Sequence, residues 1–577
     1  MKSLLQALLL VTLVSLFSYA QEKTPPPSRV QKTPPPTAAN QQTPSELPPQ
    51  PAQPSQPQTQ RRSEAQAVQP ESTAQQRTTE TSPDGPTLRP MHFDMAEVPP
   101  VQTHHEIRIN GKPLRYTATV GRLPIKDAEG KIEAQMFFVA YTLDDADLAT
   151  RPVTFAFNGG PGSASIWLHM GALGPRKVVL QPDGTLPEAP YHLMDNANTP
   201  LDRTDLVLVD AIGTGYSRPA DTAAARRYWS LRGDIESFSE FIRMYLSRYE
   251  RWLSPHYLFG ESYGTTRSAG IAGYLADRGI SFNGIVLLSM VLNFESLDFA
   301  KTNDVPYPLF LPTFASIAVY HHKLAPELMQ DAGRTRQEVA QWAMGEYSQA
   351  LDKGDALTPD ERQAIIDKLA RYTGLNKDII DLANLRIDVR LFTHYLLADQ
   401  KLRVGRYDGR FTAPDPNGFF DTQFFDPTNA QIGPPFTSVF NDYIRRELNY
   451  KVDMPYYTSA RDSGLFQWSW TGGPPPPTAA AATTDQGYTD TATALRQAIV
   501  KNPFLKVLVM EGYYDLATPF LAANYTMNHL DLTPQYHKNI STATYDSGHM
   551  VYLNSTQHPK MKQDFVNFID SSLPKGR

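Results

Sequence analysis

The chain has 577 residues, a formal net charge of −6 and no cysteine. This length allows a large core and more than one domain, and the charge balance gives no support for binding to nucleic acid or to an anionic membrane. The absence of cysteine excludes disulfides, thiolate metal sites, a cysteine nucleophile and the cysteine that a bacterial lipid anchor needs.

Residues 1–20 are predicted to be a secretory signal peptide. Lys2 supplies the positive charge, residues 4–17 are apolar, and small residues near Ala20 suit a cleavage site. The alternative is a membrane anchor, but the apolar run is shorter than the roughly 20 residues that a spanning helix needs. We therefore expect a secreted or periplasmic protein with no membrane span after the signal is removed.

Residues 21–90 are predicted to be a disordered tether. They are rich in Pro, Gln, Thr and Ser and contain no Phe, Trp, Tyr or Ile. Such a segment cannot bury enough apolar surface to offset the entropy of ordering it. The alternatives are a cell-wall spacer or a ligand for a partner protein.

Globular patterning begins near residue 104 with an antiparallel arrangement of strands. Residues 105–109 alternate between apolar and polar, and Asn110-Gly111 is a strong hairpin turn signal. Residues 114–120 and 134–141 are expected to continue as strands.

Further along, short apolar runs alternate with helical segments, one of which is expected to start after Asp234. Such runs are typical of strands that are buried on both faces of a parallel sheet. The alternation predicts an α/β fold with a mostly parallel, doubly wound sheet. The runs are residues 153–157, 206–209, 257–259, 284–288 and 507–510.

Residues 295–485 interrupt this alternation with helices and aromatic loops. Residues 358–361 (TPDE) are predicted to open one helix as a capping box with Pro in the first turn. We interpret 295–485 as a cap insertion over the carboxyl edge of the sheet, where ligands bind in open α/β folds. The core is then made of residues 91–294 and 486–577.

Residues 260–264 (GESYG) follow one predicted strand and precede a helix rich in small residues. Strand, G-x-S-x-G and helix in this order form the nucleophile elbow of α/β-hydrolases, so Ser262 is the predicted nucleophile. The alternative is a turn that matches the motif by chance.

A serine nucleophile needs a base, and the base needs a carboxylate to orient it. Asp515 follows the last apolar run, and His549 lies downstream of it, so the chain order Ser, Asp, His is that of α/β-hydrolases. Asp546 is a rival for the acid but lies close to His549 in sequence. Asp210 is another, but it is expected to hold the glycine loop that follows it.

Residues 158–162 (NGGPG) follow the strand at 153–157 and could supply backbone donors to a developing oxyanion. The alternative is a phosphate-binding glycine loop, which would usually continue with Lys-Ser/Thr. Here Ser163-Ala164-Ser165 follows instead.

Together these segments resemble the successive motifs of the serine carboxypeptidase family, over about 150–293 and 486–577. The resemblance implies an α/β-hydrolase fold and a role for each matched residue. Ser262 would be the nucleophile, His549 the base and Asp515 its orienting acid. The remaining implied roles are an oxyanion hole formed by the backbone N–H groups of Gly160 and Tyr263, and a site for the substrate's terminal carboxylate formed by Asn158 and Glu261.

That carboxylate site has a physical requirement, because two adjacent carboxylates must share a proton. The chain also departs from the family pattern at four positions, where Ala156, Ser163, Arg267 and Tyr552 are atypical. The middle insertion matches poorly, so the preferred side chains of the substrate are not predicted.

The predicted function is a serine-type carboxypeptidase that acts on peptides with a free C-terminus and needs no cofactor. The alternatives are an esterase or acyltransferase with the same catalytic residues, and a binding protein without activity. The adjacent pairs His104-His105 and His321-His322 lack metal-ligand spacing, so no metal site is predicted.

Overall fold

The computed structural model describes residues 92–420, 425–470 and 488–573. The predicted signal peptide (1–20) and tether (21–90) lie outside the described residues, as do the glycines at 472 and 473. None of the described helices is long and apolar enough to cross a membrane.

A 10-stranded sheet forms the centre of the described chain, and its first strands are antiparallel. β1 (Val101–Ile109) pairs with β2 (Lys112–Lys126) across the Asn110-Gly111 turn, which confirms the predicted hairpin. β3 (Ile132–Leu143) follows β2, and β8 (Arg218–Pro219) pairs with the start of β3.

The rest of the sheet is parallel, and its strands are the five predicted apolar runs and one further strand. The five predicted strands are buried on both faces, as the absence of alternation in these runs predicts, whereas the further strand at the edge of the sheet is partly exposed. In spatial order they are β7 (Asp205–Val209), β4 (Val153–Phe157), β9 (His256–Glu261), β10 (Gly284–Leu288), β13 (Lys506–Gly512) and β14 (Ile540–Tyr545).

The connections change direction between β4 and β9. From β4 the chain passes to β7 on one side, whereas from β9 it passes to β10 on the other. Ligands in open α/β sheets bind at such a switch point, outside the carboxyl ends of the strands. Both predicted active-site loops begin here, one after β4 and the other after β9.

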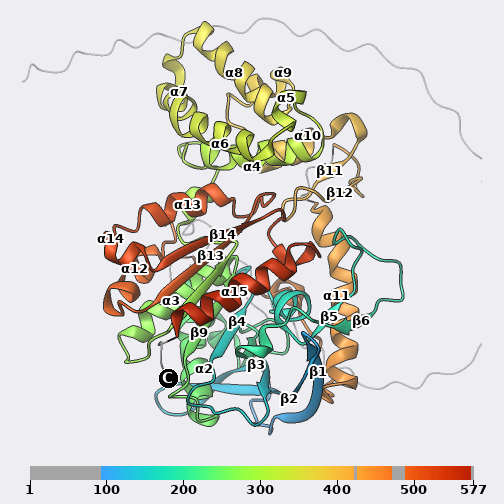
Figure 1. The fold of residues 1–577 in the computed structure, drawn as a ribbon, viewed down its shortest axis with the longest axis vertical. Coiled ribbons are helices and arrows are strands. Elements are labelled where there is room, and N and C mark those ends of the chain that lie inside the picture. Colours follow the sequence, from blue (N-terminus) through green and yellow to red (C-terminus); the bar gives the residue numbers. More distant parts are fainter. Residues whose placement is uncertain (1–91, 421–424, 471–487, 574–577) are drawn as a thin grey trace, which may run out of the picture. The chain divides into compact units, whose positions relative to one another are not determined.

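Helices cover both faces of the sheet (Figure 1). Phe155 of β4 packs with helices of one face, whereas its neighbour Ala156 packs with those of the other. The first face carries α2 (Leu231–Arg248), α3 (Tyr263–Ala276), α12 (Ala492–Lys501) and α13 (Phe520–Asn528), and the second carries α11 (Pro427–Arg446) and α15 (His558–Ser572).

The start of α2 differs from the sequence prediction. The helix begins at Leu231, because the Ser230 side chain accepts a hydrogen bond from the backbone of Gly233 and caps it. Asp234 was predicted to precede the helix, but it lies within the first turn. The prediction was wrong because Asp and Ser are equally good capping residues and the apolar pattern does not choose between them.

The predicted insertion contributes to two hydrophobic cores. Its helices up to residue 395 form a core of their own, and the capping box at Thr358 and Glu361 is present as predicted. α11, by contrast, packs into the core on one face of the sheet. The helices of the separate core are α4 (Pro306–Tyr320), α5 (Pro326–Met329), α6 (Ala332–Trp342), α7 (Ser348–Lys353), α8 (Pro359–Thr373), α9 (Lys377–Leu382) and α10 (Val389–Tyr395).

Small elements complete the fold. Two pairs of short antiparallel strands lie apart from the central sheet. They are β5 (Arg176–Val178) with β6 (Leu193–Asp195) and β11 (Arg403–Val404) with β12 (Thr412–Ala413), and the short helices are α1 (Thr222–Tyr228) and α14 (Pro534–His537).

A mostly parallel sheet flanked by helices, with a serine at the strand-to-helix turn after β9, is the α/β-hydrolase fold that the sequence predicts.

Candidate active site

Ser262 lies at the sharp turn between β9 and α3. Its backbone has φ 61° and ψ −132°, a conformation that costs energy in a non-glycine residue. The flanking glycines are required by space, because a Cβ on Gly260 would lie 2.2 Å from the carbonyl oxygen of Gly264. The strained turn holds the partly exposed serine at the carboxyl edge of the sheet.

The loop after β4 lies directly against this turn. A Cβ on Gly159 would lie 2.4 Å from the backbone nitrogen of Tyr263, and Gly160 has a φ of 105°. Tyr263 is the first residue of α3, so its N–H has no acceptor within the helix and lies at the positive end of the helix dipole. The two predicted oxyanion donors therefore lie on adjoining segments.

His549 and Asp515 meet at the carboxyl ends of β14 and β13. His549 Nδ1 lies 2.7 Å from Asp515 Oδ2, and both side chains are buried. A proton on Nδ1 leaves Nε2 free to accept another. Among the described residues no hydrogen bond joins Ser262 to His549, although both line one cavity; such bonds often form only when substrate is bound.

Thr518 completes the environment of Asp515. Its backbone nitrogen donates to Asp515 Oδ1 at 3.0 Å and its hydroxyl donates to Oδ2 at 2.8 Å. The Ala517 nitrogen also donates to Oδ1, at 2.7 Å. Sequence reasoning missed Thr518, although a threonine three residues after an aspartate is a typical partner in such a turn. These bonds fix the carboxylate that is hydrogen-bonded to His549.

The electrostatics favour a protonatable imidazole. Burial works to lower the pKa of His549, but the charge and hydrogen bond of Asp515 outweigh it, so the pKa is raised. The Glu261 charge adds to this increase. Protonation of Glu261 therefore favours the neutral imidazole that a general base requires.

Glu261 is buried beside Ser262, with 1% of its surface exposed. Burial raises its pKa to about 7, although His549 and the hydroxyl of Tyr552 both work against this change. Tyr552 donates to Glu261 Oε2 at 2.9 Å. Tyr552 is one of the departures from the family pattern, and sequence reasoning gave it no role.

Asn158 is held in one orientation at the end of β4. Its side-chain oxygen accepts from the backbone of Leu168 at 2.9 Å, which leaves the amide N–H groups to donate elsewhere. Hydrogen bonding from this side chain lowers the pKa of Glu261. The structure thus brings Asn158 and Glu261 together, as the predicted carboxylate site requires.

Arg267, which also departs from the family pattern, holds the loop after β4 through a hydrogen bond to its backbone. It is fully buried in α3, and its Nη1 donates to the carbonyl oxygen of Asn158 at 2.7 Å. Its Nε pairs with Asp234 at 2.7 Å, and the same aspartate accepts from the Tyr263 hydroxyl at 3.1 Å. One buried ion pair therefore contacts both sides of the predicted oxyanion hole.

The two rival aspartates lie elsewhere. Asp546 is exposed, and the Asp210 carboxylate accepts from the backbone of Ser165 at 2.7 Å. A Cβ on Gly215 would lie 1.7 Å from Asp210 Oδ2, so Asp210 packs against the glycine loop as expected. Neither is bonded to His549.

The loop that carries His549 is also held by the predicted insertion. The His549 nitrogen donates to the Tyr407 carbonyl at 2.6 Å, and Gly548 donates to Asp408 Oδ2 at 3.0 Å. Ser289 donates to the carbonyl of His549 at 2.7 Å. No local sequence pattern reports contacts between segments so far apart.

A cavity of about 470 Å³ opens over these groups. Its lining includes Asn158, Gly160, Glu261, Ser262 and His549. The described residues contain no cluster of His, Cys, Asp or Glu that could hold a metal ion. The cavity size suits a small ligand or the end of a chain.

Comparison with known proteins gives one family match. The model of the serine carboxypeptidase family matches residues 113–285. Among curated proteins none matches the sequence.

Solved structures show more distant likenesses. The prohormone-processing carboxypeptidase Kex1(Δ)p from Saccharomyces cerevisiae is 13% identical, with a TM-score of 0.48 over 79% of this chain and 91% of that one. Proline iminopeptidase from Mycobacterium smegmatis is 14% identical, with a TM-score of 0.32 over 78% and 98%. A carboxyl esterase from Bacillus coagulans is 11% identical, with a TM-score of 0.32 over 78% and 98%. Values this low carry no conclusion about activity.

The family match covers both the loop at residues 158–162 and the elbow at 260–264, which confirms the resemblance drawn from these motifs. Residues 113–285 thus resemble the serine carboxypeptidase family.

Proposed function

We propose that this protein is a secreted serine carboxypeptidase that removes residues from the free C-terminus of peptides. The observation that carries the proposal is Glu261, a buried carboxyl group with a pKa of about 7 that lines the same cavity as Ser262. A protonated glutamate can donate a hydrogen bond to a substrate carboxylate, which an ester hydrolase does not need. The family match supports a peptide hydrolase.

In this proposal Ser262 Oγ attacks the carbonyl carbon of the last peptide bond while His549 Nε2 takes its proton. Asp515 keeps the proton on Nδ1 and stabilises the imidazolium that forms. The N–H groups of Gly160 and Tyr263 donate to the oxyanion. His549 then gives its proton to the leaving amine, and a water molecule cleaves the acyl-enzyme by the same steps.

Asn158 and Glu261 would hold the terminal carboxylate of the substrate. The amide donates to one oxygen, and the protonated Glu261 donates to the other. A peptide bound in this way exposes its last peptide bond, because the carboxylate site lies next to the nucleophile in sequence and in space. The positions of these two residues thus favour exopeptidase over endopeptidase activity.

The predicted division of the chain is part of the proposal. Residues 1–20 would direct secretion or export to a periplasm, and 21–90 would act as a tether. Residues 295–485 would cap a core made of 91–294 and 486–577. The contact of Tyr407 with His549 supports a role for this insertion at the site.

The test uses two N-blocked dipeptides that differ only in a free or an amidated C-terminus, with amino-acid release followed by mass spectrometry. The wild-type protein is expected to hydrolyse the free peptide, and Ser262→Ala is expected to release nothing. Equal cleavage of both peptides would contradict a carboxypeptidase. Cleavage of simple esters without cleavage of the free peptide would favour the esterase alternative.

A further inference from the structure

The segment at residues 458–462 lies along the glycine loop of the active site. The nitrogen of Ala164 donates to the Thr458 carbonyl at 3.0 Å, and the nitrogen of Ala460 donates to the Gly162 carbonyl at 2.8 Å. Ser459 forms an antiparallel bridge with Ser163 between these bonds. The segment is therefore held at the cavity by its backbone.

A single turn of helix, Ala460–Ser463, fixes the direction of this segment. Ser459 and Asp462 form a capping box, in which the Asp462 carboxylate accepts from the nitrogen of Ser459 at 3.0 Å. The Thr458 hydroxyl donates to the same oxygen at 3.2 Å. The nearest carboxylate in sequence is thus occupied by its own turn.

Arg461 belongs to this turn, is exposed, and lines the cavity. Within residues 92–420, 425–470 and 488–573 its guanidinium makes no ion pair. The other titratable side chains of the lining are Glu261, His549 and Tyr407. Since Glu261 loses its charge as pH falls through about 7, Arg461 is the one permanent charge among the described lining residues.

We propose that Arg461 forms a subsite for a carboxylate side chain of the peptide next to the scissile bond, so that acidic peptides are preferred. The proposal rests on the carboxypeptidase function above and names its substrate class. In the proposed function, Asn158 and Glu261 bind the terminal carboxylate of the substrate. Arg461 is therefore available to bind a side chain of the peptide. Arginine suits this role because its planar group binds a carboxylate through two hydrogen bonds.

The expected preference is moderate, because an exposed ion pair is screened by water and salt. Such pairs contribute about 1 kcal/mol or less, which corresponds to roughly five-fold in affinity. The preference should therefore be measured at low ionic strength and should decrease when salt is added.

The experiment measures binding of N-blocked dipeptides to the full chain with Ser262→Ala, which prevents turnover. The peptides carry Glu or Gln at the last or the penultimate position, because these side chains have the same shape and differ in charge. The Glu peptide is expected to bind roughly five-fold more tightly at one of the two positions. Arg461→Gln should remove this difference, and Arg461→Glu should reverse it.

Arg108→Gln is the matched control, because Arg108 is exposed on β1 and does not line the cavity. This variant changes the net charge equally and should keep the preference for Glu. Equal binding of Glu and Gln peptides at both positions would overturn the subsite, as would an absence of binding by every peptide.

A further comparison separates the two carboxylates that a peptide offers. If Arg461→Gln weakened all free-terminus peptides equally but left amidated ones unchanged, Arg461 would bind the terminal carboxylate, and the side-chain subsite would be wrong. Release of amino acids by the wild-type protein is measured separately. Its absence would contradict the proposed function whatever the binding data show.

Discussion

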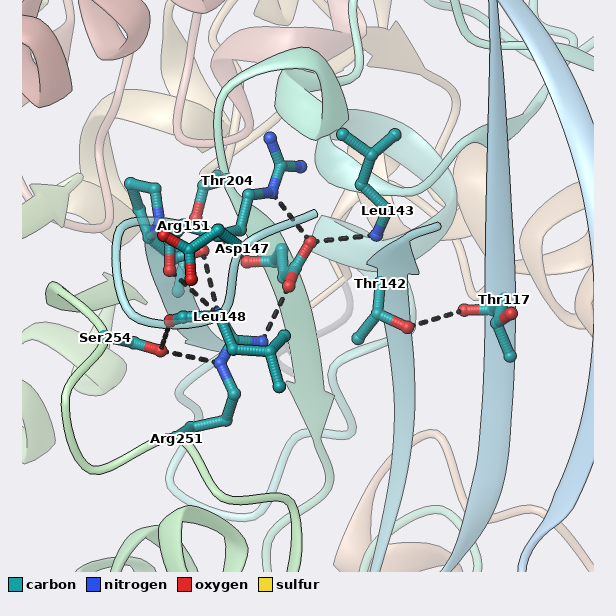
Figure 2. Close-up of polar contacts among 12 residues, drawn as sticks. Thr117, Thr142, Leu143, Asp147, Leu148, Arg151, Thr204, Arg251 and Ser254 are labelled. Carbon is teal, nitrogen blue, oxygen red and sulfur yellow. Dashed lines mark hydrogen bonds and ion pairs between the residues drawn. The ribbon is translucent and has the colours of Figure 1, made fainter. Parts of the chain in front are cut away.

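Two buried carboxyl groups lie at opposite ends of the parallel strands and have different surroundings. Asp205 is the first residue of β7 and is fully buried between two arginines. Its Oδ1 accepts from Arg151 at 2.9 Å and its Oδ2 accepts from Arg251 at 2.6 Å. The nitrogen of Leu143 also donates to Oδ1, at 3.0 Å, and Figure 2 shows this group of contacts.

Glu261 is the last residue of β9 and is equally buried, but none of the described arginines or lysines pairs with it. Its hydrogen-bond partners are neutral groups, the hydroxyl of Tyr552 and the side chain of Asn158. Asp205 is thus paired with two arginines, whereas Glu261 has no such partner among the described residues and burial raises its pKa to about 7. At the amino ends of the strands, Asp205 stabilises the fold through its ion pairs. At the carboxyl ends, Glu261 can gain and lose a proton.

The largest effect is expected at the carboxyl edge, from Asp515→Asn. The asparagine cannot hold a proton on His549 Nδ1, so kcat for peptides should fall by about 10⁴-fold. Circular dichroism should still show a folded protein. Asp546→Asn is the control, because Asp546 is exposed and should tolerate the change. A comparable loss in the control would mean that the acid has been assigned to the wrong aspartate.

At the amino edge, Asp205→Asn should instead lower the free energy of unfolding by about 3–5 kcal/mol, because it leaves two buried arginines without their counter-charge. Denaturation with urea measures this loss. Activity per folded molecule should not change. Asp442→Asn, which breaks an exposed pair with Arg446 at 2.9 Å, should cost about 1 kcal/mol or less. Equal losses would remove the distinction between these ion pairs.

Only those parts of the site that have a local sequence pattern could be predicted. The elbow and the β4 loop could be placed because each is a short motif next to an apolar run. The bond between Asp515 and His549 followed from their chain order. The contact of Tyr407 with His549 and the approach of Arg461 to the cavity could not be predicted, because they join segments that are far apart in sequence and carry no local pattern.

Glu261→Gln should convert the titratable carboxyl into a permanent hydrogen-bond donor. In the wild type, peptide hydrolysis should fall as pH rises through about 7, because the ionised Glu261 repels the substrate carboxylate. The variant should move this alkaline limb upward by more than one pH unit, as kcat/KM profiles would show. The alkaline limb of the pH profile for ester hydrolysis should be the same in the wild type and in the variant. If the alkaline limb for peptides did not move, Glu261 would not be the group that binds the substrate carboxylate.

The smallest effect is expected from Tyr552→Phe, which removes one hydrogen bond and keeps the ring. The groups that act on Glu261 are His549, Tyr552, Asp515 and Asn158. The hydroxyl of Tyr552 stabilises the ionised form of Glu261 and so lowers its pKa. Without it the pKa of Glu261 rises, and the alkaline limb for peptides should move upward by roughly one pH unit or less.

Tyr545→Phe is the matched control for this variant, because it removes a buried hydroxyl that donates to Asp564 at 2.8 Å, away from the cavity. It should leave the limb in place. A purely structural role for Tyr552 would lower stability without moving the limb. A downward shift would mean that the hydroxyl favours the protonated form of Glu261, and the contrast between an ion-paired Asp205 and a hydrogen-bonded, titratable Glu261 would then need another cause.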